Sequence, residues 1–323
     1  MMGHVNFRIM VAAAGLVGSA LIGPAAWAQS CNESCLKAIM HQYLEQLPRH
    51  DAGSLPVSPQ INARENTEPV KLGYGSWKTV AAVLPGLEFA DPATGQVIYA
   101  GGVRRDGAIG TLFLRLRVAD GKITESEMLT TGPGALTPPR PAGGLRPGGA
   151  PAGGARAGGR GPGPAPDLSG LLQPDILYDV VVPKDRRSSR EQLANIPYLY
   201  MEGLAKGDGS IPPFGPRCDR YAAGGRKLTN NPANRGGAIS CAMAVGAMKA
   251  MKGLSVVNRR IAVVDVPHGI AVGMFIVAVD MGGGRAFAQD VAEVFKVVDG
   301  KIRSIEEFGA PGQVPPDSGF PGR

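Results

Sequence analysis

One short pattern occurs twice in this chain, and it constrains the fold more than any other feature. Residues 118–127 (VADGKITESE) return as residues 297–307 (VVDGKIRSIEE). In each copy, Asp-Gly supplies the positive-φ residues of a tight turn between an apolar strand and an alternating one. Two near-identical hairpins at the ends of two long segments indicate that the segments themselves are duplicates.

A second pair of landmarks supports the duplication. Residues 43–47 (YLEQL) correspond to residues 200–204 (YMEGL), 157 positions later, whereas Val297 follows Val118 by 179 positions. The second copy therefore holds 22 more residues between its landmarks. We expect two versions of one unit, at residues 31–131 and 186–310. Because two copies are too few for a solenoid, the sequence predicts a two-lobed protein, a pseudo-dimer within one chain, with further oligomerisation left open.

The first 28 residues are typical of a secretory signal peptide. An apolar run at residues 9–22 is too short to span a bilayer, and Ala26-Trp27-Ala28 is an A-x-A cleavage site. We expect the mature protein to begin at Gln29 and to be secreted or periplasmic, without a later membrane span. Ala28-Gln29-Ser30 lacks the branched apolar residue that precedes a lipidated cysteine, so Cys31 is not expected to be an anchor.

Export places the four cysteines in an oxidising compartment, where disulfides form. Three pairings are open, and we favour Cys31 with Cys35 and Cys218 with Cys241 because each bridge then stays within one copy. The second bridge would close the extra segment of the larger copy and contribute about 3 kcal/mol in the loop-entropy model. Metal binding has little support, since Cys-x-x-x-Cys is not zinc-ribbon spacing and no histidine lies near either pair.

Each unit is predicted to pair a helix with a curved antiparallel sheet. In the first unit, Ser30 and Glu33 form a capping box before an apolar helix face that ends at Pro48. The second unit repeats this with Ser188 and Glu191, and Pro197 predicts a kink. The predicted strands are residues 87–90, 96–104, 108–118 and 122–130, then 260–266, 269–280, 285–298 and 301–308. The fold class is therefore α+β.

Residues 132–166 consist largely of Gly, Pro, Ala and Arg, which cannot bury a core, so we expect a disordered linker between the lobes. The chain carries a net charge of +7, but Arg8 of the leader and four linker arginines supply most of it, which leaves +2 on the lobes. A nucleic-acid partner therefore has little support. The linker is either a solvated spacer or a contact for anionic polymers, and residues 311–323 are expected to form a flexible tail.

The second unit holds an insertion at residues 240–251 that predicts a small amphipathic helix. Met243 and Met248 on this helix either line a deformable apolar wall that binds a ligand or belong to the core. Gly282-Gly283-Gly284 joins two strands and does not open a helix, so it predicts a hairpin turn and no phosphate site.

These features together resemble a known fold family. The helix, the segment 207–214 (GDGSIPPF) and the closing hairpin at 294–302 look like the nuclear-transport-factor-two-like superfamily, which includes the SnoaL-like cyclases and ketosteroid isomerase. More closely, the mature chain resembles a family of secreted tandem-domain proteins of unknown function. The shared features are CNESCL at 31–36, Glu65-Asn66, GYGSW at 73–77, LRLRV at 114–118, Cys218-Asp219-Arg220, TNNP at 229–232 and Arg259-Arg260.

The resemblance implies two cone-shaped lobes, each a curved antiparallel sheet covered by helices. It says little about activity, because the superfamily holds isomerases, cyclases, dehydratases, hydrolases and plain binding modules. This chain has no clear counterpart of the Tyr and two-Asp set of ketosteroid isomerase, nor of the His-Asp pair of scytalone dehydratase.

Four residues are candidates for acid/base chemistry. Asp290 lies in an otherwise apolar strand, and a carboxyl pointing into a dry cone would have a raised pKa; otherwise it faces outward or lies at an edge. His268 follows Asp265 by three residues and could act as a base, although histidines in turns are usually solvent-facing. Tyr200 and Glu65 complete the catalytic set.

The predicted ligand-binding set is Tyr43, Met243, Met248 and Trp77. Tyr43 and Tyr200 lie on helix faces that cover the sheets, where a hydroxyl either reaches a ligand or makes one structural hydrogen bond. Arg115 and Arg117 share one strand face, which is either solvated, an anion-contacting wall or a lobe interface.

The sequence leaves two functions open. One is an exported protein that binds a small, largely apolar or aromatic molecule in a cone-shaped pocket and performs cofactor-free acid/base catalysis of the isomerase, dehydratase or lyase type. The other is a non-catalytic ligand-binding or protein-interaction module. No nucleophile elbow, Walker loop or zinc signature is present, and no metal or cofactor is predicted.

Overall fold

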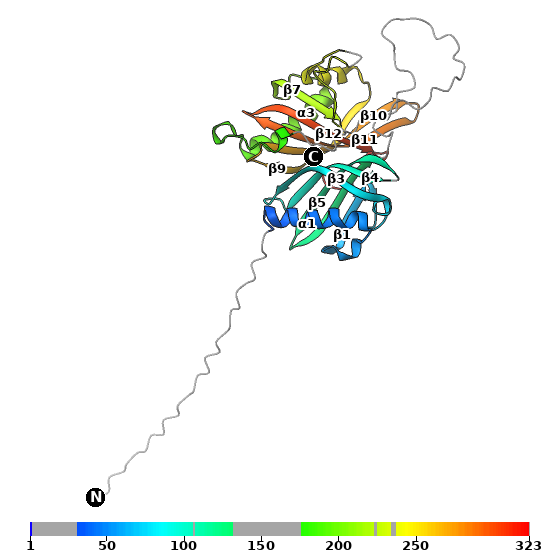
Figure 1. The fold of residues 1–323 in the computed structure, drawn as a ribbon. Helices are drawn as coiled ribbons and strands as arrows, with labels where there is room; N and C mark the ends of the chain where they lie inside the picture. Colours follow the sequence, from blue (N-terminus) through cyan, green and yellow to red (C-terminus); the bar gives the residue numbers. More distant parts are fainter. Residues whose placement is uncertain (2–30, 106, 132–175, 223–224, 234–236, 323) are drawn as a thin grey trace.

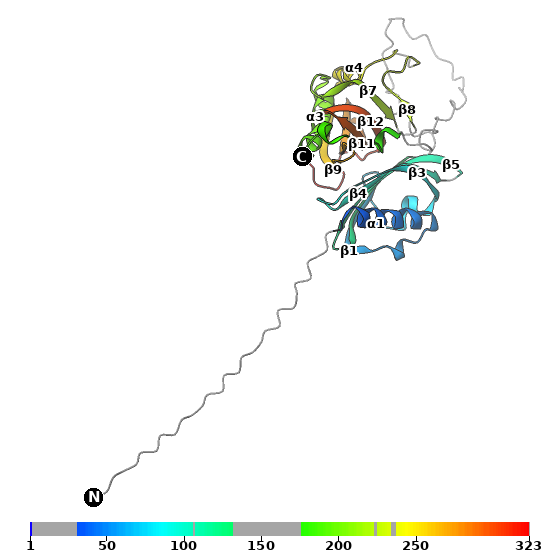
Figure 2. The same ribbon diagram turned by 60° about the vertical axis from the view of Figure 1, so that its left-hand side comes forward.

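Two curved sheets stack back to back, and each carries a helix on its outer side (Figure 1). The computed structural model describes residues 1, 31–105, 107–131, 176–222, 225–233 and 237–322. The predicted leader, apart from Met1, and the predicted linker at 132–166 lie outside the described residues. The layer order is helix, sheet, sheet, helix, and the two sheets form the centre of the molecule (Figure 2).

The first lobe is one long helix laid across a six-stranded sheet. Its elements are α1 (Glu33–Gln46), β1 (Val57–Glu65), β2 (Glu68–Pro69), β3 (Val80–Asp91), β4 (Gln96–Arg105), β5 (Ala108–Ala119) and β6 (Lys122–Thr131), with short 3-10 turns at Leu47–Arg49, Ala52–Ser54 and Gly75–Lys78. The strand order is β2-β1-β6-β5-β4-β3. Strands β3 to β6 form an antiparallel meander, as their Asp-Gly and Gly-containing turns predict.

The second lobe repeats this plan with an inserted helix. Its elements are α3 (Arg190–Lys206), β7 (Phe214–Ala222), β8 (Arg226–Lys227), α4 (Cys241–Gly246), β9 (Leu254–Asp265), β10 (Ile270–Gly282), β11 (Arg285–Val298) and β12 (Lys301–Pro311), with 3-10 turns at Ile176–Tyr178, Lys184–Arg186 and Ala247–Ala250. The strand order is β8-β7-β12-β11-β10-β9. Gly282, Gly283 and Gly284 all have positive φ and make the β10–β11 turn, as predicted.

One sheet detail differs from the sequence-based prediction. We expected antiparallel sheets, but β1 pairs with β6 in parallel and β7 pairs with β12 in parallel. In each lobe the strand that follows the helix lies beside the last strand of the meander, and these two strands run in the same direction. The sheets are therefore mixed, and the predicted α+β fold, a curved sheet covered by a helix, is present in both lobes.

The duplication is in register at the level of single strand pairs. On β5 and β6, Leu114 pairs with Met128, and on β11 and β12 Glu293 pairs with Glu307. Each residue of the second pair follows its counterpart by 179 positions, the same separation as the two turns. Equivalent positions in the two lobes can therefore be compared residue by residue along these hairpins.

Both helices begin one or two residues later than predicted. Asn32 caps α1 by accepting a 3.0 Å hydrogen bond from the Cys35 amide, in place of the predicted Ser30. The capping box of α3 is formed by Ser189 and Gln192, one residue after the predicted pair. In both cases a neighbouring short polar side chain satisfies the same orphan amides.

Pro197 lies inside α3 and packs directly on the sheet. A methyl group built on Gly273 of β10 would lie 2.6 Å from the Pro197 Cβ and 2.8 Å from the Met201 Cε, so only glycine fits there. The absence of a side chain at Gly273 therefore allows the Pro197 ring of α3 to pack against β10.

Three apolar cores correspond to the three contacts between layers. The first lies between α1 and its sheet and includes Tyr43, Trp77 and Leu114. The third lies between α3 and its sheet and includes Tyr200, Phe275 and Phe295. The second core lies between the two sheets, where Ile98, Phe113 and Leu129 of the first lobe meet Val272, Met274, Val294 and Phe308 of the second.

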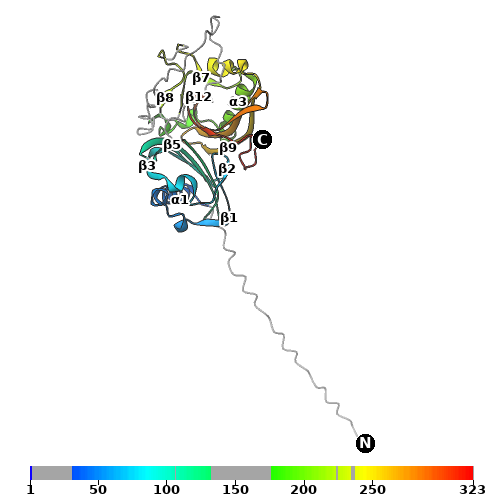
Figure 3. The ribbon, with the colours of Figure 1, turned by 90° about the vertical axis from the view of Figure 1, so that its right-hand side faces the viewer.

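Charged groups also join the lobes. Arg260 of β9 makes two hydrogen bonds to Glu127 of β6, at 2.8 and 2.7 Å, and Arg190 of α3 pairs with Asp91 of β3 at 2.5 Å. Glu127 is buried, and although burial raises its pKa, the guanidinium groups of Arg260 and Arg115 outweigh this and hold the pKa below its usual value. The lobes are therefore packed as one body, as Figure 3 shows from the side.

Residues 312–322 differ from the flexible tail that the sequence predicts. They run across both lobes: Asn62 of the first lobe donates to the Gly319 carbonyl at 3.0 Å, and Asn258 of the second donates to the Phe320 carbonyl at 3.3 Å. Phe320 is 5% exposed and Ser318 is fully buried. The reason is that Phe320 finds a buried place at the seam between the lobes, which composition alone does not reveal.

Both predicted disulfides are present, with Cys31 bonded to Cys35 and Cys218 bonded to Cys241. The second joins β7 to α4 and so fixes the inserted helix on the sheet. Among the described residues, none of the helices is apolar and long enough to cross a bilayer.

Candidate functional site

The interior of the second cone holds four polar side chains, which we call the cone cluster: Tyr200, Arg220, Glu293 and Glu307. The Tyr200 hydroxyl donates to Glu293 Oε1 at 3.2 Å. The Arg220 guanidinium donates to the same oxygen at 3.1 and 3.3 Å and also to Glu307 Oε2. One carboxylate oxygen therefore receives hydrogen bonds from both a phenol and a guanidinium.

The elements of the lobe explain why these side chains meet. Tyr200 lies on the inner face of α3 among buried apolar residues. Glu293 of β11 is paired directly with Glu307 of β12, and β7, which carries Arg220, lies next to β12. Three neighbouring strands and the covering helix thus each contribute one group. The rings of Phe295 and Phe214 lie 5.1 and 6.3 Å from the Tyr200 ring and form apolar walls.

The environment of Glu293 favours its protonated form. The residue is completely buried, and this burial, opposed by Arg220 and reinforced by the charge of Glu307, raises its pKa to about 7. Burial likewise raises the pKa of Tyr200 well above its usual value, so the phenol stays a hydrogen-bond donor. A carboxyl group with a pKa near neutrality can both accept and donate a proton under physiological conditions.

One oxygen of the Glu293 carboxyl group makes no hydrogen bond within the described part of the chain. Glu293 Oε2 is buried and has no hydrogen-bond partner among the described residues. Arg220 and Glu307 are the more accessible members, with side-chain exposures of 23% and 18%. The cluster is thus closed at Glu293 and reached from the side of Arg220 and Glu307.

The first lobe forms the same fold without a counterpart of the cone cluster. Counting along the matched hairpins, Leu114 and Met128 occupy the positions of Glu293 and Glu307. Ala63, which pairs with Ser126, stands where Arg220 pairs with Ile305. All three first-lobe residues are buried, and Leu114 and Met128 belong to its apolar core. The same fold is therefore built with an apolar interior in one lobe and a charged interior in the other.

Of the four predicted catalytic residues, only Tyr200 belongs to the cone cluster. Asp290 is buried in β11 but on the opposite sheet face, toward the first lobe, and not inside the cone. Burial and the nearby Glu127 raise its pKa to about 8, and neither of its oxygens has a hydrogen-bond partner among the described residues. The pKa of Asp290 is raised, as expected, but the residue does not lie in the cone. Strand alternation puts it on the same face as Ala292 and Val294, which faces the first lobe.

His268 forms a dyad with Asp265 in the β9–β10 turn. Its Nδ1 lies 2.9 Å from Asp265 Oδ2, and its side chain is 27% exposed. The ring lies 6.3 Å from the Phe89 ring of the first lobe, so the dyad is at the edge of the lobe interface. Nearby, Lys296 is bound through its Nζ to the carbonyls of Val180 and His268 at 2.5 and 2.6 Å, which anchors this corner.

The predicted first-lobe residues hold each other in place. The Tyr43 hydroxyl accepts from Trp77 Nε1 at 3.0 Å and lies 3.0 Å from Ser126 Oγ, and burial raises its pKa to about 12. Glu65 accepts from the Ser76 amide and hydroxyl at 2.9 and 2.6 Å, which closes the turn that carries Trp77. Trp77 is 1% exposed, so its indole fills the cone where a ligand was expected.

The methionines and arginines occupy different surroundings from one another. Met243 is 61% exposed on α4, so it lines no wall, while Met248 is packed against the third core. Arg115 is buried between the lobes and binds Glu127 and Glu125, whereas Arg117 is 53% exposed. The sequence left a solvated face, an anion-contacting wall and a lobe interface open for these two arginines. Arg115 lies in the lobe interface, and Arg117 is exposed to solvent.

The sequence-based reasoning missed Glu293, Arg220 and Glu307. Glu293 lies three residues after Asp290 in the same apolar strand, and both carboxylates carry the same signal. Superposing the two copies at their separation of 179 positions would have aligned two glutamates with Leu114 and Met128. Among the residues that the structure describes, no group of three or more His, Cys, Asp or Glu could hold a metal ion.

Residues 186–309, which form most of the second lobe, match a family profile described as a domain of unknown function, DUF8021. Curated protein sequences gave no match.

Solved structures align with one lobe's length of the chain. A protein of unknown function with a cystatin-like fold from Methylobium petroleophilum PM1 is 20% identical over 40% of this chain and 82% of its own, with a TM-score of 0.30. An LEH-like epoxide hydrolase from M. tuberculosis is 15% identical over 37% and 84%, with a TM-score of 0.29. A nuclear-transport-factor-two-like protein of unknown function from Cytophaga hutchinsonii is 10% identical over 38% and 99%, with a TM-score of 0.28.

Proposed function

We propose that the second cone binds a small, largely apolar organic molecule and that Glu293 transfers a proton on it without a cofactor. The observation that carries the proposal is the exchange of Leu114 and Met128 for Glu293 and Glu307 at equivalent buried positions. Replacing apolar core residues by a buried ionic group seldom increases stability. A charged interior that the duplicated fold does without is therefore best explained by chemistry.

Each member of the cone cluster has a role in this proposal. Oε2 of Glu293 removes a proton from a carbon next to a carbonyl group, and the same carboxyl returns it to another atom of the molecule, so the reaction is a balanced isomerisation. Tyr200 positions Glu293 through its hydrogen bond to Oε1. Arg220, held by Glu307, balances the negative charge that Glu293 carries before it takes up the proton and again after it returns it. Phe214 and Phe295 supply apolar contacts beside the phenol.

A specific observation also favours the alternative, a non-catalytic binding module. Glu293 is wholly enclosed, so a molecule must enter past Arg220 and Glu307 before it reaches the carboxyl group. A ligand that is held by Arg220 and does not reach Glu293 would bind without undergoing proton transfer. The export of the protein to an oxidising compartment, which the two disulfides suit, is proposed with either function.

The test is a thermal-shift screen of the mature chain with small aromatic, terpenoid and polyketide-like molecules. Each stabilising compound is then incubated in D2O and examined by mass spectrometry for deuterium uptake or conversion. We expect uptake with wild-type protein and its loss in Glu293→Gln, with an exposed carboxylate changed in the same way, Glu68→Gln, as the control. Binding without uptake would favour the binding module.

The same assay decides among the earlier candidates. If uptake survives in Glu293→Gln but disappears in Asp290→Asn or His268→Ala, the chemistry belongs to the lobe interface and the proposal is wrong.

A further inference from the structure

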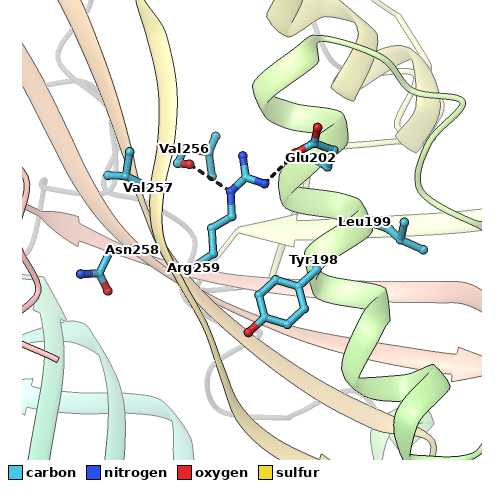
Figure 4. Close-up of a pocket in the computed structure, with 7 residues that line it drawn as sticks. All are labelled: Tyr198, Leu199, Glu202, Val256, Val257, Asn258 and Arg259. Atoms are coloured by element: carbon cyan, nitrogen blue, oxygen red, sulfur yellow. Dashed lines mark hydrogen bonds and ion pairs between the residues drawn. The ribbon is translucent and has the colours of Figure 1, made fainter. Parts of the chain in front are cut away.

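Two hollows of about 530 and 330 Å³ lie beside α3 and β9. Both hollows are lined by Tyr198 and Arg259, so they lie next to each other, and we call them together the seam groove. In Figure 4, Tyr198 and Glu202 project from α3 toward Arg259 on β9. Ligand sites of this size, about 300–1,000 Å³, are typical for small organic molecules.

The inner part of the groove lies at the seam between the lobes. Its lining comes from Gln96, Arg115, Arg117 and Glu125 of the first lobe, from Arg259 and Arg260 of the second, and from Phe320 of the tail. Four guanidinium groups thus face this space. The carboxylates beside them are Glu125, Glu202 and, beneath the surface, Glu127.

The arginines are not all neutralised by these carboxylates. Arg115 uses all three of its nitrogens, on Glu127, Gln96 and Glu125. Arg260 gives both terminal nitrogens to Glu127, but its buried Nε has no partner among the described residues. Because burial keeps Asp290 behind it protonated at neutral pH, with a pKa of about 8, the groove keeps an excess of positive charge.

Two other arginines present donors at the mouth. Arg259 donates through Nε to the Val256 carbonyl and through one terminal nitrogen to Glu202. Its second terminal nitrogen has no acceptor among the described residues and can donate to a ligand. Arg117 is 53% exposed and makes one hydrogen bond, to Glu125 at 3.2 Å. These free donors face the groove and not the cores.

Aromatic rings flank the positive charges. The Phe320 ring lies 4.6 Å from the Arg115 guanidinium carbon and 5.4 Å from that of Arg260. Tyr198 lines both hollows at the point where they meet. Aromatic rings offer contacts to a planar apolar body, and guanidinium donors offer hydrogen bonds to an anionic group.

We propose that the seam groove binds a small aromatic carboxylate, with the carboxylate on Arg117 and Arg259 and the ring beside Tyr198 and Phe320. This site lies on the opposite face of α3 from Tyr200 and is independent of the proton transfer proposed for the cone. It is assembled from both lobes and the C-terminal tail, so neither lobe contains it alone.

The test is titration of the mature full-length chain with benzoate and with its neutral analogue benzamide at constant ionic strength. We expect benzoate to bind and benzamide to bind at least tenfold more weakly, because the neutral amide lacks the negative charge and the second acceptor oxygen that pair with the guanidinium groups. Arg117→Ala and Arg259→Ala should each weaken benzoate about tenfold. Arg285→Ala, a change at an exposed arginine of the β10–β11 turn, serves as the matched control.

Three results would overturn the proposal. Benzamide could bind as well as benzoate, Arg285→Ala could weaken binding as much as Arg117→Ala, or Glu293→Gln could abolish benzoate binding while Arg117→Ala leaves it intact. The last result would place the ligand in the cone. Arg117 is a surface side chain with one partner, so its alanine variant keeps the test valid even if Arg259→Ala does not fold.

Discussion

The raised pKa of Glu293 makes the stability of the second lobe depend on pH. In the unfolded chain the carboxyl group titrates near 4.5, and in the folded protein burial moves its pKa to about 7. Between these values the folded state binds the proton and the unfolded state does not, so stability falls as pH rises from 4.5 through 7. The difference corresponds to about 3 kcal/mol at pH 8.

Glu293→Gln removes this titration and keeps the shape of the side chain. We expect urea unfolding at pH 5 and pH 8 to show a smaller loss of unfolding free energy in the variant than in the wild type, by about 2.5 kcal/mol. Glu202→Gln is the control, since hydrogen bonds from Arg259 and Lys206 lower the pKa of that carboxylate to about 2. An unchanged pH dependence in Glu293→Gln would refute the assignment of this titration to the cone cluster.

Two further predictions concern the packing of the layers. Gly273→Ala should destabilise the second lobe by about 1–3 kcal/mol in thermal unfolding, because the new methyl group meets the Pro197 ring. Gly246→Ala is the control, since its new methyl group meets nothing within 4 Å and its φ is −59°. Glu127→Gln should cost about 3–5 kcal/mol, because Arg260 and Arg115 lose their buried counter-charge between the lobes. A variant whose urea midpoint matches wild type would contradict the interfacial role of Glu127.

The duplicated hairpins allowed much of the fold to be predicted. Asp120-Gly121 and Asp299-Gly300 occupy the predicted turns with positive φ, and the strands on either side pair as expected. The sequence did not predict that β1 pairs in parallel with β6, or β7 with β12. A polar strand that follows a helix has no periodic pattern that shows which strand it pairs with.

The site was harder to predict, because both faces of the central strands are buried. Strands buried on both faces have continuous apolar runs, so the alternation that assigns a residue to one face is absent. Asp290 and Glu293 consequently looked alike in sequence, although one faces the other lobe and the other faces Tyr200. Which face is the cone interior depends on how the two sheets pack, and that is a long-range property.

Local context also misled the prediction at three places. The strand bearing Arg115 alternates as a solvated face would, but the second lobe covers it. Trp77 and Tyr43 suggested a ligand wall and instead fill the first cone themselves. Phe320 lies in a Gly- and Pro-rich end that composition assigns to a tail, yet it is held at the seam by two guanidinium groups.

The back-to-back contact of the sheets gives the two copies unequal freedom to change. The first lobe covers the face of the second sheet that points away from α3, with Ile98, Phe113 and Leu129 as its contact surface. That cover contributes burial that a solitary cone would have to find in its own interior. The contact between the sheets therefore adds burial to a second lobe whose own interior carries the buried charges of Glu293 and Arg220, which the first lobe lacks at the equivalent positions.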